Sequence, residues 1–428
     1  MKKMGYKWGI MLVGLLLLIT LVGCSDESSN ESKEEKVEKD EIVIGVTNPL
    51  SGALAEMGQD NQEGIKLAIE LKNKEGGING KQIRIVEADV PEATAAKTEA
   101  ERLIDKEKVD LIIGTYGSSI SLAISEVTAR KNIPYFEVVS LSNSISNRGY
   151  KNVYRINPNA DKFAVVAMDA LQNVIPQKLG KDFKDLKVVL IHEDTDNGTS
   201  WMDAFEEIME AEGLEDVIKM RESYSAQTND MSSLILKVKN AEPDAVVAVS
   251  YLNDAIQFVR QSKELGVNYP VLMGGGSGWG QPGLQEAVGN LTEGILDIEY
   301  PPLPPLSNAE AMPGIETYIT EYESVYNEEP ESLYGHSSFA STNTILEILE
   351  NAESVSAEDI EVAAYSVDKE WWTTASGWGA KFEQEGEFIG QNSRTAPYLT
   401  QWIDGKLTVV APEEISVIEP VIPKPDWK

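Results

Sequence analysis

Short apolar runs alternate with amphipathic stretches along the first part of the chain. An apolar run at residues 42–47 is followed by a turn at 48–52 and an amphipathic stretch at about 60–74, which predicts strand, loop and helix. Further strands are expected at 82–89, 109–114 and 133–139, and helices at 93–106 and 119–131. Strands that alternate with helices of this length indicate a parallel sheet with right-handed crossovers.

A second array of the same kind begins after Asn157. Strands are expected at 187–192, 217–221, 244–250 and 271–274, and helices at 163–179, 200–212, 230–240 and 254–265. Two arrays of similar size predict an α/β protein with two doubly wound, Rossmann-like lobes. The tail is less regular, with helices expected at 315–326 and 338–351 and a hairpin at 398–410. Such a tail can cross between the lobes more than once.

The first residues are typical of a secretion signal. Lys2, Lys3 and Lys7 precede an apolar run that ends at Gly23, and the chain's only cysteine, Cys24, follows in a context that resembles a lipobox. Residues 1–23 are therefore expected to be a lipoprotein signal peptide. Cys24 is expected to carry the lipid that anchors an extracytoplasmic protein to the cell membrane, in the Gram-positive manner. An uncleaved anchor and an incidental buried thiol in an ordinary signal peptide are the alternatives.

The segment after Cys24 is acidic and polar. Residues 24–41 include no aromatic residue and a single aliphatic side chain after the cysteine, Val37, so they cannot bury enough surface to fold. This segment is expected to be a disordered tether between the anchor and the folded part.

Composition excludes several classes of function. A net charge of −33 and a pI of about 4.4 argue against a nucleic-acid partner. One cysteine and two histidines cannot form a zinc site, an iron–sulfur site or a Cys/His nucleophile pair, so His192 and His336 are expected to be structural. The chain contains no dinucleotide-binding, P-loop or serine-hydrolase motif. No catalytic residue, metal or cofactor is therefore expected.

Polar loops follow the predicted strands of the first array. Tyr116, Ser118 and Ser119 lie between a strand and a helix, where free backbone N–H groups and the helix dipole would bind a carboxylate. Alternatively, one serine is only a helix cap. The loop that begins at Ser140 is expected to converge on the same place, because the carboxyl ends of parallel strands meet at one edge.

The second array offers similar loops at 193–200, 250–253 and 274–280. Tyr251 and Trp279 lie in two of these loops and would stack on an apolar part of a ligand, or would pack in the core instead. The glycines at 274–276 suggest a phosphate cradle, but the missing nucleotide motifs argue against it.

The chain resembles the branched-chain amino acid binding family of ABC transporter solute receptors over residues 42–428. The resemblance rests on the order and spacing of several segments. These are IVIGVTNPLSGALAEMGQDNQEGIKLAIE, GGINGKQIRIVEAD, LIIGTYGSS, NIPYFEVVS, RGYKNVYRINPNA, EDTDNGTS, PYLTQWIDGKLTVVAP and IPKPDW.

The resemblance implies a type I periplasmic-binding fold, with two lobes joined by a three-strand hinge that close on a ligand. The N-terminal lobe is expected at 42–157 and about 302–390, and the C-terminal lobe at about 158–301 and 391–428. The implied function is that of an extracytoplasmic receptor, a monomer that takes a small carboxylate-bearing solute to an ABC permease.

The family's ligand-binding positions also carry over to this sequence. Carboxylate donors fall on Ser118 or Ser119 and on Val139, Ser140 and Leu141. The family's first-lobe aromatic position falls at Met57, and contacts from the second lobe fall near Asn197 and Tyr251. In the loop at 274–280, Gly276 and Ser277 are also expected to contact the ligand, beside Trp279.

One position departs from the family pattern. The acidic residue that typically neutralises a ligand's α-ammonium falls near Gly276, where the chain has no acid. A buried ammonium without a carboxylate is costly, which favours an aromatic or other organic acid over an amino acid, unless Glu137 or Asp194 supplies the charge. A ligand-sensing accessory lipoprotein is the alternative function.

Overall fold

The computed structural model describes residues 41–427. The predicted signal peptide, Cys24 and residues 24–40 of the predicted tether lie outside the described residues. Glu41, the last residue of that predicted tether, is the first residue of a strand. In the described part of the chain, no helix has the length and apolar character needed to cross a membrane.

The first sheet has five parallel strands in the order β2-β1-β3-β4-β5. Its strands are β1 (Glu41–Asn48), β2 (Gln82–Asp89), β3 (Leu111–Gly114), β4 (Tyr135–Glu137) and β5 (Val153–Arg155). All residues of β3, β4 and β5 are buried, as expected for parallel strands covered on both faces.

The second sheet has seven strands in the order β12-β11-β10-β9-β8-β6-β7. Its strands are β6 (Val188–Glu193), β7 (Ile218–Tyr224), β8 (Ala245–Ser250), β9 (Val271–Ser277), β10 (Leu296–Glu299), β11 (Tyr398–Ile403) and β12 (Lys406–Ala411). Strand β11 runs antiparallel to β10 and to β12, and the other neighbouring pairs are parallel, so the sheet is mainly parallel. The two sheets confirm the predicted α/β fold class with two arrays.

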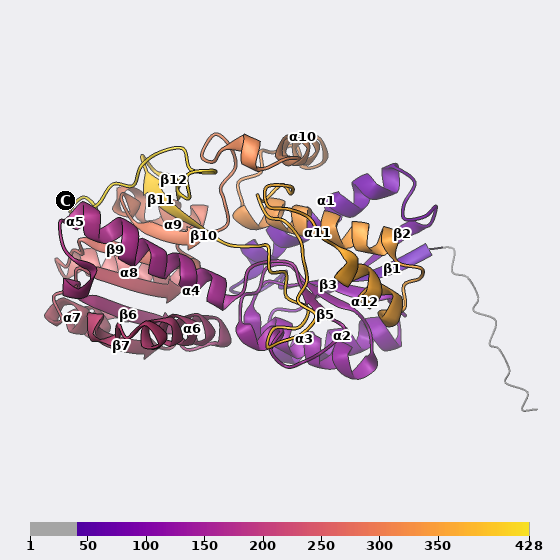
Figure 1. Cartoon of the computed structure of the whole chain (residues 1–428), viewed down its shortest axis with the longest axis horizontal. Coiled ribbons are helices and arrows are strands. Elements are labelled where there is room, and N and C mark those ends of the chain that lie inside the picture. Colours follow the sequence, from indigo (N-terminus) through magenta and orange to yellow (C-terminus); the bar gives the residue numbers. More distant parts are fainter. Residues whose placement is uncertain (1–40, 428) are drawn as a thin grey trace, which may run out of the picture. The chain divides into compact units, whose positions relative to one another are not determined.

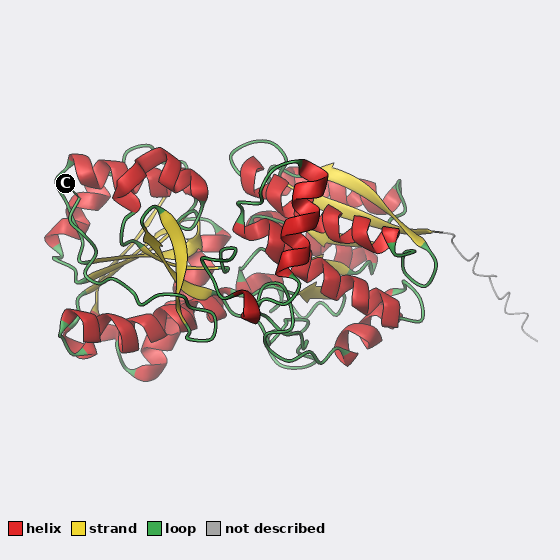
Figure 2. Ribbon diagram, turned by 90° about the horizontal axis from the view of Figure 1, so that it is seen from above, coloured by secondary structure: helices red, strands yellow, loops and turns green. Residues whose placement is uncertain are grey.

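Helices flank the strands of both sheets (Figure 2). They are α1 (Ala55–Lys74), α2 (Ala93–Asp105), α3 (Ser118–Lys131), α4 (Ala160–Asp169), α5 (Ile175–Leu179), α6 (Asp196–Glu212), α7 (Ser232–Asn240), α8 (Leu252–Glu264), α9 (Pro282–Val288), α10 (Ile315–Tyr326), α11 (Leu333–Asn351) and α12 (Ala357–Ser366). Although far apart in sequence, α11 packs along α1, and Figure 1 shows the orange α11 and α12 beside the indigo strands of the first sheet.

The chain therefore passes three times from one sheet with its flanking helices to the other. The passages lie between β5 and α4, between β10 and α10, and between α12 and β11. Asn392 joins the first and third passages, because its Nδ2 donates to the carbonyl of Ile156 at 3.0 Å. Arg155 and Gln391 also form an isolated parallel bridge.

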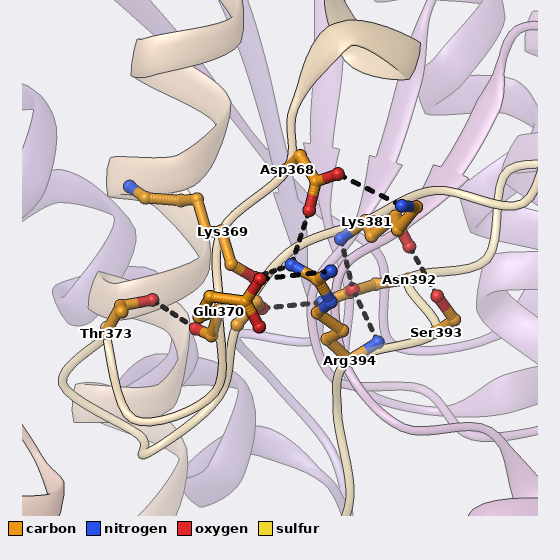
Figure 3. Close-up of polar contacts among 9 residues, drawn as sticks. Asp368, Lys369, Glu370, Thr373, Lys381, Asn392, Ser393 and Arg394 are labelled. Atoms are coloured by element: carbon orange, nitrogen blue, oxygen red, sulfur yellow. Dashed lines mark hydrogen bonds and ion pairs between the residues drawn. The ribbon is translucent and has the colours of Figure 1, made fainter.

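Polar contacts hold the irregular segment between α12 and β11 (Figure 3). The Asn392 side chain accepts from the backbone N–H of Lys381 at 2.9 Å and from that of Arg394 at 3.0 Å. The Arg394 guanidinium donates to the carbonyl of Lys369 at 2.7 Å and forms an ion pair with Asp368 at 2.5 Å. Side chains thus order this segment together with isolated backbone bridges, such as those between Lys369 and Ala380 and between Phe382 and Asn392.

Some of the predicted helices and strands begin or end at other residues in the structure. Helix α6 begins at Asp196 instead of residue 200, because the Thr195 side chain accepts from the backbone N–H of Asn197 and caps it. A π-helical turn (Ala170–Val174) interrupts the helix expected at 163–179. Strand β9 continues through the glycines to Ser277, so these glycines belong to the sheet. Four elements, β5, α9, β10 and α12, were not predicted.

A close helix crossing generates a stability prediction. A Cβ atom added at Gly64 would lie 1.9 Å from the carbonyl oxygen of Gly335, where α1 crosses α11. Gly64→Ala should therefore lower the free energy of unfolding by about 2 kcal/mol or more. Gly80→Ala is the control, because nothing lies within 4 Å of its added Cβ and only the positive φ of 83° opposes it. Equal decreases in the free energy of unfolding for the two variants, measured by urea titration, would contradict this close crossing.

Candidate functional site

A small cavity lies at the carboxyl ends of strands from both sheets. Its volume is about 20 Å³, roughly the space that one water needs. Its walls come from the loops after β3, β4, β8 and β10, from the end of β9 and from the first turns of helices. Lining residues are Tyr116, Gly117, Ser118, Val139, Ser140, Leu141, Phe163, Asn197, Tyr251, Ser277, Glu299, Tyr300 and Tyr334. A larger ligand can enter only if the walls separate or side chains rotate.

The N-terminus of α3 forms one wall. Gly117 precedes the helix with a φ of 101°, a conformation that favours glycine, and Ser118 is the first helical residue. Ser118 Oγ accepts a hydrogen bond from the backbone N–H of Ser142 at 3.2 Å. Its own hydroxyl proton is therefore free to donate to a ligand. The side chain of Ser140 instead donates to the carbonyl of Thr115 at 2.7 Å.

Glu137 organises the loop that follows β4. Its Oε1 accepts from the backbone N–H groups of Val138, Val139 and Ser140 at 2.9, 2.8 and 2.7 Å, and from that of Thr115 at 3.2 Å. Burial raises the pKa of this carboxyl, and the hydrogen bonds to its charged form oppose that shift. The N–H groups of Val139 and Ser140 thus already donate to Glu137. The Glu137 Oε1 atom binds the backbone around its own loop and is not available to a ligand.

Arg155 holds the same loop from its other side. Its guanidinium donates to the carbonyls of Leu141 at 3.1 Å and Ser142 at 2.5 Å, and to the side chains of Ser146 at 2.7 Å and Gln391 at 2.5 Å. Burial lowers the pKa of Arg155 to about 10, which leaves it charged at neutral pH. A buried anion and a buried cation therefore fix this stretch of backbone at the cavity.

The N-terminus of α6 forms the opposite wall. Glu193 accepts from the backbone N–H groups of Thr195 at 2.6 Å and Gly198 at 2.5 Å, so this carboxylate caps the helix. Asn197 Nδ2 donates to Glu193 at 3.1 Å and to Ser277 Oγ at 3.2 Å.

Two hydrogen bonds join the walls directly. Ser119 Oγ donates to Asp196 Oδ2 at 2.5 Å, and the backbone N–H of Asn143 donates to Ser200 Oγ at 2.8 Å. These bonds connect α3 and the β4–β5 loop to α6 beside the cavity.

Tyrosine rings surround the cavity. The Tyr116 ring lies 5.1 Å from that of Tyr334 and 6.4 Å from that of Tyr251, and the Tyr300 ring lies 5.8 Å from that of Tyr334. Burial raises the pKa of all four hydroxyls, so they remain protonated. Tyr300 donates to the carbonyl of Val139 at 2.9 Å. The Tyr116 hydroxyl has no hydrogen-bond partner among residues 41–427.

Glu299 places a carboxylate in the cavity wall. It is 1% exposed and accepts from the backbone N–H of Tyr300 at 2.9 Å. The Tyr334 hydroxyl shares its one proton between Glu299 at 3.1 Å and the carbonyl of Ser277 at 3.0 Å. Asp297, two residues earlier on the same face of β10, accepts from the backbone N–H of Gly276 at 2.9 Å. Burial raises the pKa of both carboxyls, and the charge of Asp297 raises that of Glu299 further.

Comparison with known proteins identifies the family. A model of the periplasmic binding protein family matches residues 41–406. The chain belongs to this family. The earlier resemblance is thereby confirmed, and so is the expectation of a solute-binding protein instead of an enzyme, because the family and the similar proteins are substrate-binding proteins.

Individual relatives cover nearly the whole chain. The Leu/Ile/Val-binding protein homolog 7 of Brucella suis biovar 1 (strain 1330) is 36% identical over 385 residues, which are 90% of this chain and 94% of that protein. The solved structure of the branched-chain amino acid transporter substrate binding protein LivJ from Streptococcus pneumoniae str. Canada MDR_19A, in complex with isoleucine, has a TM-score of 0.72 at 22% identity. It covers 89% of this chain and 100% of its own.

A second solved structure agrees in fold. The leucine binding protein LivK from Thermotoga maritima MSB8 has a TM-score of 0.72 at 24% identity and covers 89% of this chain and 99% of its own. Both structures show that the fold is that of type I periplasmic binding proteins.

Most of the residues singled out from the sequence line the cavity. They are Tyr116, Ser118, Val139, Ser140, Leu141, Asn197, Tyr251 and Ser277. Four others lie elsewhere. Met57 and Trp279 are buried in the core, Ser119 binds Asp196, and Gly276 donates its N–H to Asp297 behind the cavity wall.

Sequence reasoning missed Glu299, Tyr300, Tyr334 and Phe163. For Glu299 a signal existed, because Asp297 and Glu299 alternate with apolar residues in a short run that reads as a strand. Within residues 41–427, no group of three or more His, Cys, Asp or Glu residues is arranged to hold a metal ion.

The loop held by Arg155 generates a stability prediction. Arg155→Met should lower the free energy of unfolding by about 3 kcal/mol or more, because it leaves buried carbonyls without donors. Arg102→Met is the matched control. Arg102 is half-buried on α2 and forms surface ion pairs with Glu99 and Glu107, so its loss should cost about 1 kcal/mol or less. Similar losses for both variants in chemical denaturation would contradict this role of Arg155.

Proposed function

We propose that the protein is the extracytoplasmic receptor of an ABC importer and that its two lobes close on a small carboxylate-bearing solute. The observation that carries the proposal is the N-terminus of α3 in the cavity wall, with the hydroxyl proton of Ser118 free. A helix N-terminus attracts anions through its dipole and its unpaired N–H groups. Relatives that are named for leucine, isoleucine and valine are consistent with such a solute.

Lobe closure supplies the mechanism of capture. We take the lobes as 42–157 with about 302–390, and about 158–301 with 391–428, so that the three passages between the sheets act as the hinge. The bonds from Ser119 to Asp196 and from Asn143 to Ser200 would form on closure and break on opening. The cavity of about 20 Å³ supports this view, because a solute larger than water must enter an opened form.

Delivery to a permease follows from the same closure. The closed form presents the surfaces of both lobes in one fixed arrangement, which a membrane permease can distinguish from the open form. The receptor would act as a monomer, held near the permease by lipid on Cys24 and by residues 24–41. A deletion strain that loses uptake of the bound solute, and regains it with the wild-type gene, would favour this function over a sensing lipoprotein.

Removal of the Ser118 hydroxyl tests carboxylate binding. Ser118→Ala should weaken binding of the carboxylate solute about 10-fold, because one hydrogen bond to a charged group is lost. Thr98→Ala is the control, since the Thr98 hydroxyl donates only to a carbonyl of its own helix, on the exposed face of α2. Isothermal titration should show the loss for Ser118→Ala alone. An unchanged affinity would argue against carboxylate recognition at α3.

Lipid attachment at Cys24 can be tested in cells. Cys24→Ala should abolish incorporation of labelled fatty acid, because a thiol is needed for the lipid bond, and should shift the protein from the membrane fraction. Ser25→Ala should leave both unchanged. Labelled Cys24→Ala protein would show that the lipid is carried elsewhere, and unlabelled Cys24→Ala protein that stays in the membrane fraction would show that the segment is an uncleaved anchor.

A further inference from the structure

A second pocket lies apart from the cavity, between α1, α9, α10 and the first turn of α11. Its volume is about 320 Å³, and it shares no lining residue with the cavity. Six acidic residues line it: Glu56 and Asp60 from α1, Glu286 from α9, and Glu328, Glu329 and Glu331 from the loop before α11. Among residues 41–427, no lysine or arginine lines this pocket, and none of the six acids forms an ion pair. This acidic pocket therefore holds uncompensated negative charge.

A buried tyrosine hydroxyl lies in the wall of the acidic pocket without a partner. Tyr318 lines the pocket and is 1% exposed, and its hydroxyl forms no hydrogen bond within residues 41–427. The neighbouring Tyr322 differs, because its hydroxyl donates to Glu63 at 2.6 Å. Gly335 makes room for the Tyr318 hydroxyl, since a Cβ atom added there would lie 2.4 Å from its oxygen. A buried polar group is costly unless it is bonded, so this hydroxyl indicates a ligand in the pocket.

Asp60 shows how strongly the acids of this pocket act on one another. Its pKa is raised to about 7, chiefly by burial. A hydrogen bond with Ser332 opposes this shift, and the charges of Glu63, Glu56 and Glu328 add to it. Burial and like charges both disfavour the ionised carboxylate. A positive charge in the pocket would offset both effects, because it would pair with Asp60 and screen it from the neighbouring acids.

The size and the walls of the pocket determine which kind of cation fits. A volume of about 320 Å³ is far more than one metal ion needs, and within residues 41–427 no three His, Cys, Asp or Glu side chains are arranged to hold a metal. Tyr318, Tyr322, Pro282 and Pro330 add aromatic and apolar surface. Aromatic faces attract cations, and apolar surface accommodates methylene groups. The pocket therefore fits a flexible chain of methylenes that carries several charged nitrogens.

We propose that the acidic pocket binds a linear aliphatic diamine or polyamine between α1 and α9. Charged nitrogens of the amine pair with Asp60 on α1 and with Glu286 on α9, and one N–H group donates to the Tyr318 hydroxyl. The two helices are close there, because a Cβ atom added at Gly283 of α9 would lie 3.6 Å from Glu56 Oε1. The inference does not depend on the proposed function, since the pocket and the cavity share no residue.

Amines of increasing charge test this inference. Calorimetry on the full chain in non-ionic detergent, at about pH 7.5 and about 150 mM salt, compares spermidine, putrescine, propylamine and Mg²⁺. Spermidine should bind as one molecule per chain, at least about 10-fold more tightly than propylamine or Mg²⁺, with putrescine between them. Equal affinities for spermidine and Mg²⁺, or several spermidine molecules per chain, would show only a diffuse attraction of cations to an acidic protein and would overturn the inference.

Acids on the two sides of the pocket are the variants. Asp60→Asn and Glu286→Gln should each weaken spermidine binding at least about 5-fold, because each removes one negative charge that faces the amine. Asp60→Asn should fold normally, since asparagine resembles the protonated form of Asp60 that burial favours. A loss of affinity in only one of these variants would mean that the amine does not lie between α1 and α9, and it would contradict the proposal.

Glu207→Gln is the matched control. Glu207 lines a different acidic pocket beside α6, together with Asp203 and Glu387, and the variant removes the same amount of charge from the protein. Spermidine binding to Glu207→Gln should equal that of the wild type. If Glu207→Gln weakened spermidine binding as much as Glu286→Gln, the net charge of the protein and not this pocket would determine the affinity.

The pH dependence of binding gives an independent readout. The titratable groups around Asp60 are Glu56 and Glu63 from α1, Tyr318 and Tyr322 from α10, Glu328 from the following loop and Glu286 from α9. From α11, the pocket receives Gly335 and no titratable side chain of the described chain. Because Asp60 holds a proton below about pH 7 and must lose it to pair with an ammonium, spermidine affinity should rise between about pH 5.5 and about pH 7.5. The rise should be smaller in Asp60→Asn, and equal profiles for the variant and the wild type would exclude Asp60 from the site.

Discussion

Two opposite buried charges on one loop determine the form of the binding site. Glu137 accepts the N–H groups at the start of the segment 138–142, and Arg155 donates to the carbonyls at its end. Each charge is satisfied by backbone groups and by neutral side chains instead of by direct pairing, with Ser121 and Tyr135 at Glu137 and with Ser146 and Gln391 at Arg155. The cost of burial stays low only while the loop has this path. The loop that forms the cavity wall is therefore rigid, and its position is coupled to Gln391 in the third passage between the sheets.

This use of the loop changes how a ligand can be recognised. The backbone donors that the family resemblance assigned to a carboxylate at Val139 and Ser140 already bind Glu137. Under the proposed function, recognition of an anion would then depend on α3, where the hydroxyl of Ser118 accepts from Ser142 and keeps its proton available. Positioning of the loop and recognition of the solute would thus be divided between neighbouring strands of one sheet, the first at the end of β4 and the second at the end of β3.

The sequence predicted the fold well because strands and helices bury one face each, and the spacing of apolar residues along the chain reflects that burial directly. It also placed the strand-end loops at the site, because topology brings them together whatever their side chains do. It could not find Tyr334, which reaches the cavity from α11 after a proline-rich stretch, or Tyr300, which begins a passage between the sheets. The glycines at 274–276 were read as a loop, since the reason for glycine is tertiary packing: an added Cβ would meet Asp297 at Gly274, Val249 at Gly275 and Phe163 at Gly276. Contacts of this kind depend on tertiary structure and leave no local pattern.

The charges of the cavity also determine what its walls can offer to a solute. The N-terminus of α3 offers a positive potential at one wall, and the buried Glu299, whose pKa is raised, lies at another, while the tyrosines between them are neutral. Under the proposed function, a polar group of the solute that met no partner at either wall would be desolvated and uncompensated on closure. Discrimination between solutes would therefore arise from the whole cavity and from no single contact.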